Sequence, residues 1–168
     1  MTTYSIRQIG DPVLRQKADD VTEIDGALAD NAHTMIETMY AAPGIGLAAT
    51  QVDWHVRLVI IDVSKDNDAR EVFINPEILE AEGRAVGEEG CLSVPGMRGI
   101  VPRFVRLHYT GFDQYSQPID RLVSGFHARV VQHECDHLDG ILYPMRIQDL
   151  TQFGYTDVLF PDSDIADD

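Results

Sequence analysis

The sequence HECDH at positions 133–137 combines residue types and spacing that point to metal chemistry. Residues four positions apart on a helix lie one turn apart on the same face, so both imidazoles can bind one metal ion. Glu134 can then approach a metal-bound water without being a ligand itself. The two histidines continue a stripe that includes Phe126 and Val130, and a helix would bury that face. Because burying two histidines and a glutamate without a metal is costly, the spacing predicts a metal site on a helix.

A catalytic site with two histidines needs a third protein ligand and an open position. An extended HExxH motif would place a third histidine at position 143, where the chain has Tyr143, and no glutamate follows Glu134. Cys91, within EGCLS at 89–93, is the better candidate because a thiolate is a soft, negatively charged ligand. Taken by itself, a single cysteine is more typical of a small buried core residue. Cys135 lies about 200° around the helix from His133 and is expected in the core. Three downstream aspartates remain open alternatives: Asp139, Asp149 and Asp157.

The sequence GIGLAATQ at 44–51 is the third candidate for chemistry. Its two glycines allow a tight turn and a close approach of the backbone to a ligand. Gln51 could donate a side-chain N–H to a developing oxyanion. The alternative is that Gly44 only ends the preceding helix and Gln51 is a surface residue.

Composition narrows the class of protein. The 168 residues include 13 Lys and Arg against 28 Asp and Glu, a formal charge of −15, which argues against binding nucleic acid or an anionic membrane. The two cysteines cannot form a disulfide framework, which indicates a reducing compartment. Arg7, Gly10 and Pro12 interrupt the N-terminal segment, so no secretory signal is expected. The longest apolar run, 58–61, is far too short to span a bilayer. We therefore expect one cytoplasmic domain over 1–168.

Periodicity predicts the elements that position these motifs. A helix is expected from Ile24 to Ala41, with Thr22 and Asp25 as a capping pair, and a second from Gly125 to Leu138, with Ser124 as N-cap. The chain between them is rich in strand-forming residues. Helices that bracket a block of strands, without strand–helix alternation, predict an α+β fold. The expected strands are Val56–Val63, Val72–Ile74, Val101–Thr110 and Ile119–Val123.

Taken in order, GIGLAATQ, EGCLS and QHECDHLDG resemble the three signature motifs of the peptide deformylase family. Weaker resemblance extends from GDPVLR at 10–15 to LYPMRI at 142–147. The resemblance implies an α+β fold in which the HExxH helix packs among antiparallel β-sheets. It also implies removal of the formyl group from the N-terminal formyl-methionine of new polypeptides.

The resemblance also implies roles for individual residues. Cys91, His133 and His137 would bind one divalent metal ion, expected to be Fe(II) in the cell and replaceable by Zn, Ni or Co. Glu134 matches the general base. Two groups match the oxyanion donors: the Gln51 side chain and the Leu92 backbone N–H. Positions that match the methionine pocket or the peptide-binding segments are Gly46, Ile45, Glu89, Arg98, Phe126 and Val130.

Some features depart from the family pattern or leave alternatives. Thr50 and Met145 stand where many family members have proline and aspartate. The tail from about 157 to 168 is acidic and expected to be flexible, and no Lys or Arg follows Arg146. A basic C-terminal helix that docks on the ribosome, as in some family members, is therefore excluded, and any ribosome contact would be transient or use another surface. The alternative functions are a small zincin-type peptidase and a non-catalytic peptide-binding module.

Overall fold

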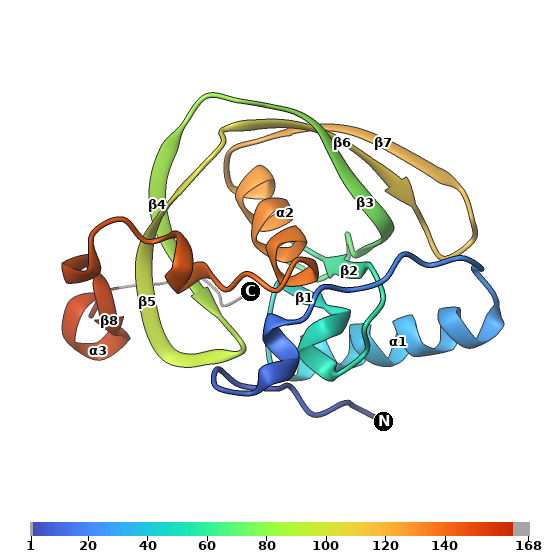
Figure 1. Ribbon diagram of the computed structural model, residues 1–168, viewed down its shortest axis with the longest axis horizontal. Coiled ribbons are helices and arrows are strands. Elements are labelled where there is room, and N and C mark those ends of the chain that lie inside the picture. The colour runs from blue at the N-terminus through green and yellow to red at the C-terminus, as the bar shows by residue number, and fades with distance from the viewer. Residues whose placement is uncertain (1, 163–168) are drawn as a thin grey trace.

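The computed structural model describes residues 2–162 and consists of two antiparallel sheets with a helix between them (Figure 1). The larger sheet has the strand order β1-β2-β3-β6-β7 and the smaller one the order β4-β5-β8. The expected α+β fold is confirmed, with the HExxH helix packed among antiparallel strands. The strands are β1 Gly46–Ala48, β2 Leu58–Ile61, β3 Glu71–Glu82, β4 Ala85–Cys91, β5 Val94–Arg103, β6 Arg106–Phe112, β7 Pro118–Ser124 and β8 Phe153–Tyr155.

The first helix, α1, spans Gly26–Ala41, two residues shorter at its start than predicted. Asp25 alone is its N-cap, because its side chain accepts a hydrogen bond from the backbone N–H of Leu28. The expected pairing with Thr22 is therefore wrong. The second helix, α2, spans Gly125–Leu138 and confirms the predicted bounds, with Ser124 in the N-cap position.

Alternation along β2 shows how the two helices enclose the larger sheet. Val59 and Ile61 pack in one core with residues of α2, whereas Leu58 and Ile60 pack in another with residues of α1. Successive side chains of a strand point to opposite faces, so a strand covered on both sides is apolar throughout. The run 58–61 is therefore apolar because both of its faces are buried.

Three strand predictions need correction. The expected strand over 101–110 is two strands, because β5 ends at Arg103 and β6 begins at Arg106. At the break, Gln132 of α2 bonds both the N–H and the C=O of Phe104, so a side chain takes the place of a neighbouring strand. The strand expected at 72–74 extends to Glu82, beyond a register shift after Ile74. The strand expected at 56–63 covers only 58–61.

The C-terminal segment returns to the smaller sheet. After the short 3-10 turn η3 (Tyr143–Arg146), β8 pairs with β5 over Met97–Gly99, and the short helix α3 (Thr156–Leu159) follows. The first residues of the segment expected to be flexible are thus helical, while 163–168 lie outside the described residues. Over residues 2–162, no helix is long and apolar enough to cross a membrane.

Candidate active site

The buried face of α2 carries the two histidines of the motif. His133 and His137 are each 1% exposed, and Val130 one turn earlier is fully buried. Their Nε2 atoms lie 3.2 Å apart, which confirms that a spacing of four residues brings both imidazoles together. Phe126, at the exposed start of the same stripe, is 46% exposed.

Cys91, at the end of β4, brings a third donor to these imidazoles. Its sulfur lies 3.4 Å from Nε2 of His137, and one donor atom from each of the three residues lies within 4.8 Å of the others. All three residues are buried. A thiolate and two neutral imidazoles form a donor set suited to a divalent transition metal, so the chemistry of the group fits such an ion.

Glu89 fixes the orientation of His133. Its Oε1 atom accepts a hydrogen bond from Nδ1 of His133 at 2.9 Å, which leaves the Nε2 lone pair facing Cys91 and His137. The same carboxylate accepts two bonds from Arg103 and one from Arg129. Burial by itself would raise the pKa of Glu89, but the hydrogen bonds from Arg103 and His133 outweigh it and hold the pKa far below its ordinary value. Glu89 is therefore an ionised carboxylate in a buried network.

Burial also sets the protonation of the two neighbouring donors. It raises the pKa of the Cys91 thiol and lowers the pKa of His137 well below its ordinary value. His137 therefore offers a neutral imidazole lone pair. A metal ion would have to displace the thiol proton of Cys91 to gain a thiolate ligand.

Gln51 reaches the group from the 3-10 turn η2 (Ala49–Val52). Its Oε1 accepts a hydrogen bond from the backbone N–H of Ala48 at 2.9 Å, and its Nε2 donates to Oγ of Ser93 at 2.9 Å. Nε2 also lies 3.7 Å from the sulfur of Cys91. The amide is fully buried, which excludes the interpretation of Gln51 as a surface residue and places two N–H donors beside the candidate metal group.

Glu134 lies beside the glycine of β1. A Cβ atom added to Gly46 would overlap the Glu134 carboxylate, with Cδ only 2.9 Å away. Only a glycine therefore allows the backbone of β1 to approach the carboxylate so closely. β1 is an edge strand of the larger sheet among the described residues, and β4, which ends at Cys91, is an edge of the smaller one.

The remaining predicted residues lie in the core beside α2 and on the smaller sheet. Ile45 and Val130 belong to the core beside α2, and Leu92 lies in the turn between Cys91 and Ser93. Arg98 of β5 is 7% exposed, with its Nε 3.5 Å from a carboxylate oxygen of Glu88.

Sequence reasoning missed two residues that contact the centre. Tyr143 stands at the position where an extended HExxH motif has its third histidine, and sequence reasoning assigned it no other role. Its side chain is buried and stacks on the ring of His133, with ring centroids 6.0 Å apart. Arg103, which joins Glu89 to Asp136, was also missed. The sequence feature that could have indicated Arg103 is its position as a charged residue directly after the apolar run Ile100–Pro102.

Two antiparallel sheets around an HExxH helix, with a buried cysteine beside both histidines, define an α+β protein of the HExxH metalloprotein class. The sequence profile of the polypeptide deformylase family matches residues 3–153, and the chain belongs to this family. This membership confirms the family predicted from the sequence and does not favour the zincin or binding-module alternatives.

Relatives and solved structures agree with the family assignment. The chain is 50% identical to peptide deformylase 1 of Nitrosomonas europaea, over 97% of this chain and 98% of the relative. It is 49% identical to peptide deformylase 2 of Ralstonia nicotianae, over 92% and 88% of the two chains. The crystal structure of peptide deformylase from Thermotoga maritima is similar with a TM-score of 0.85 and 41% identity, covering 89% of this chain and all of that one. A peptide deformylase from Legionella pneumophila has a TM-score of 0.86 at 35% identity, covering 90% and 89%.

Proposed function

We propose that this chain is a metal-dependent hydrolase that removes the formyl group from the N-terminal formyl-methionine of new polypeptides, releasing formate. The observation that carries the proposal is the convergence of Cys91, His133 and His137, with Glu134 adjacent to His133 on the same helix. Family membership supports the same reaction. The products are formate and a peptide with a free amino terminus.

Cys91, His133 and His137 would hold one divalent metal ion, for which we propose Fe(II) in the cell, with Zn, Ni or Co as replacements. Such an ion lowers the pKa of a bound water and polarises the carbonyl that the water attacks. Glu89 contributes by holding His133 in the tautomer whose Nε2 faces the site.

Glu134 is proposed as the general base. It takes the proton of the water that attacks the formyl carbon, and it later delivers this proton to the departing amine. Its carboxylate lies against Gly46 of the edge strand β1, where a peptide N-terminus can approach. Because a formyl carbon bears only hydrogen, a narrow site can admit it and exclude an acetyl group.

Gln51 and the backbone N–H of Leu92 are proposed as donors to the developing oxyanion. One N–H of the Gln51 amide is held by Oγ of Ser93, which fixes the direction of the other. The contact of that amide with the sulfur of Cys91 is long, at 3.7 Å, so a substrate oxygen can replace it.

The peptide is proposed to add to the strand edge at Gly46, since an extended chain can bond to unpaired backbone groups of an edge strand. Ile45, Phe126 and Val130 would contact the methionine side chain, and Arg98 would hold the peptide from the smaller sheet, where Glu89 acts through His133. We place this activity in the cytoplasm. Any contact with the ribosome is proposed to be transient, since no Lys or Arg follows Arg146 in the C-terminal segment.

The test is formate release from a formyl-Met dipeptide, with protein purified without air and metal content measured in the same sample. The expected result is turnover that disappears on chelation and returns with Fe(II). A folded, metal-loaded sample that releases no formate would contradict the proposed reaction.

Cys91→Ala and Cys135→Ala form a matched pair for the same assay. Both remove a buried thiol, but only Cys91 lies beside the histidines, whereas Cys135 packs in the core with Val131 and Leu138. We expect Cys91→Ala alone to lose metal and turnover. A Cys91→Ala variant that kept its metal would favour a zincin-type site instead.

A further inference from the structure

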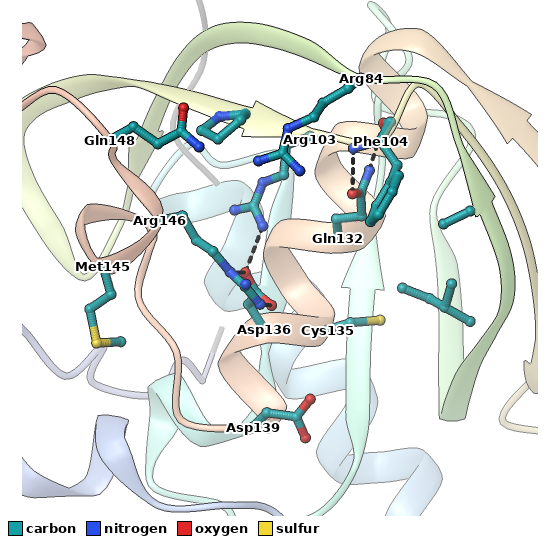
Figure 2. A pocket seen from close by; sticks show the side chains of 13 residues that line it. Arg84, Arg103, Phe104, Gln132, Cys135, Asp136, Asp139, Met145, Arg146 and Gln148 are labelled. Carbon is teal, nitrogen blue, oxygen red and sulfur yellow. Dashed lines mark hydrogen bonds and ion pairs between the residues drawn. The ribbon is translucent and has the colours of Figure 1, made fainter.

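A second pocket lies on the other side of α2 from the candidate metal group. It has a volume of about 430 Å³, within the range of small-molecule sites. Helix α2 contributes Gln132, Cys135 and Asp136, which share a face different from that of the two histidines, and Asp139 follows as the C-cap residue. The end of β5, the segment around η3 and part of β3 form the other walls (Figure 2).

Arginines dominate this pocket although the chain carries a formal charge of −15. Arg84, just before β4, and Arg103, at the end of β5, come from paired strands, since Ala85 lies opposite Arg103. Arg146 reaches the pocket from η3. Figure 2 shows Arg84 and Arg103 reaching into the same space, with Gln148 directed toward it from the opposite wall.

The ion pairs beneath the pocket leave positive charge in excess. Asp136 is shared by Arg103 and Arg146, and Glu89 is shared by Arg103 and Arg129. Three guanidinium groups thus share two carboxylates. Arg84 adds a fourth positive charge, because no hydrogen bond or ion pair joins it to any other residue between 2 and 162. The other pocket carboxylate, Asp139, is already paired with Arg57 at 3.0 Å.

The pocket also contains N–H groups that donate no hydrogen bond to another residue that the structure describes. Arg103 is 5% exposed and uses three of its five N–H groups on Glu89 and Asp136, so two remain. Arg146 uses two N–H groups on Asp136. Like Arg84, the Gln148 amide has no partner among the residues that the structure describes. Guanidinium groups with free N–H pairs bind the oxygens of phosphate groups in a two-point geometry.

We propose that this pocket binds a small organic phosphate. The phosphate group would lie between Arg84, Arg103 and Arg146, where it balances the excess positive charge. The apolar part of the ligand would contact Phe104, which is 43% exposed at the rim, and Ile78. None of the residues assigned to the proposed deformylation lines the pocket, although Arg103 also donates to Glu89, which holds His133.

The test uses phenyl phosphate as probe and isothermal titration calorimetry on the metal-loaded full chain. We expect saturable binding that Arg84→Gln weakens at least about tenfold. Arg84→Lys, which keeps the charge but loses the two-point geometry, should fall between the parent and Arg84→Gln. In Phe104→Ala, the preference for phenyl phosphate over inorganic phosphate should decrease.

Arg121→Gln is the matched control, because Arg121 is a half-exposed arginine on β7 that pairs with Glu71 away from the pocket. An equal loss of affinity in Arg121→Gln and Arg84→Gln would show a general charge effect and overturn the proposal. Binding that Arg84→Gln leaves unchanged would place phenyl phosphate at the metal centre or elsewhere, and it would also overturn the proposal. Absence of saturable binding would show that the pocket is only a hydrated cleft.

Formate release by Arg84→Gln should equal that of the parent, so failure of this site is distinguishable from failure of the proposed activity.

Discussion

Oε1 of Glu89 lies 2.9 Å from Nδ1 of His133 and 2.9 Å from Nη2 of Arg103, so one carboxylate oxygen joins the candidate metal group to an arginine on its far side. The three residues come from β4, α2 and β5 and are all buried. A histidine whose Nδ1–H is held by a carboxylate is a more basic and better oriented metal ligand. Glu89 therefore acts on the site through His133.

Glu89→Gln should lower metal affinity about 10- to 100-fold, because an uncharged amide holds His133 less strongly. The measurement is competition with a chelator, followed by a thermal melt to verify folding. Glu88→Gln is the control, since the neighbouring Glu88 pairs with Arg98 instead. Equal metal affinity in the parent and Glu89→Gln would contradict the orienting role.

Gly46→Ala should reduce turnover strongly while metal content stays near that of the parent. The added Cβ would overlap the Glu134 carboxylate and displace it, since its three nearest atoms all belong to Glu134. Formate release and metal content should be measured on the same sample. Gly26→Ala is the matched control, because a Cβ at Gly26 meets no atom within 4 Å. Unchanged turnover in Gly46→Ala would show that the position of Glu134 is not critical.

The helical part of the site was predictable because its information is local. A spacing of four residues places His133 and His137 together whatever the rest of the chain does, and the bounds of α2 followed from the same periodicity. Cys91 lies 42 residues before His133 in sequence, so elimination of other ligands could favour it but not place it. The family resemblance supplied that step.

The parts that were missed depend on packing between distant segments. The resemblance associated Glu89 with the methionine pocket or the peptide, yet its carboxylate contacts His133, Arg103 and Arg129. No local pattern encodes these contacts, since they arise only when β4 and β5 pack against α2. The break between β5 and β6 has the same origin, because it depends on a side chain of α2, Gln132.

Thr50→Val should lower the free energy of unfolding by about 1 kcal/mol. The buried Thr50 hydroxyl donates to the backbone C=O of His137 at 3.2 Å, and it is the link between η2 and the end of α2. Valine keeps the volume but removes the donor. Urea unfolding of the metal-free protein measures the effect. Thr34→Val, at a half-buried threonine whose hydroxyl bonds only within α1, should change stability less. A larger loss from Thr34→Val would contradict this assignment.

The hydrogen bond from the Tyr40 hydroxyl to Asp62, at 2.5 Å, makes a pH-dependent contribution to stability. Burial, reinforced by this bond and by the charge of Asp62, raises the pKa of Tyr40 to about 12. Burial of Asp62 would raise its pKa, but the hydrogen bonds from Ser64 and Tyr40 outweigh it and lower the pKa below 3.8. The carboxylate is therefore ionised at neutral pH, and bonds to ionised groups are the stronger ones.

Tyr40→Phe should therefore lower the free energy of unfolding at pH 8 by about 1.5 kcal/mol. The folded pKa of Tyr40 lies above the unfolded value of about 10, so its contribution is complete below pH 10 and is lost as the pH rises through 12. Asp62 has a lowered folded pKa, so its contribution is present above pH 3.8 and is lost as the pH falls through the folded value.

Urea unfolding at pH 8 and pH 11 measures the difference in free energy of unfolding between the parent and Tyr40→Phe, which should shrink at pH 11. Tyr115→Phe, at a tyrosine that is 74% exposed, should show neither the loss nor its pH dependence. A parent-to-variant difference that stayed constant between pH 8 and pH 11 would contradict the coupling of Tyr40 to Asp62.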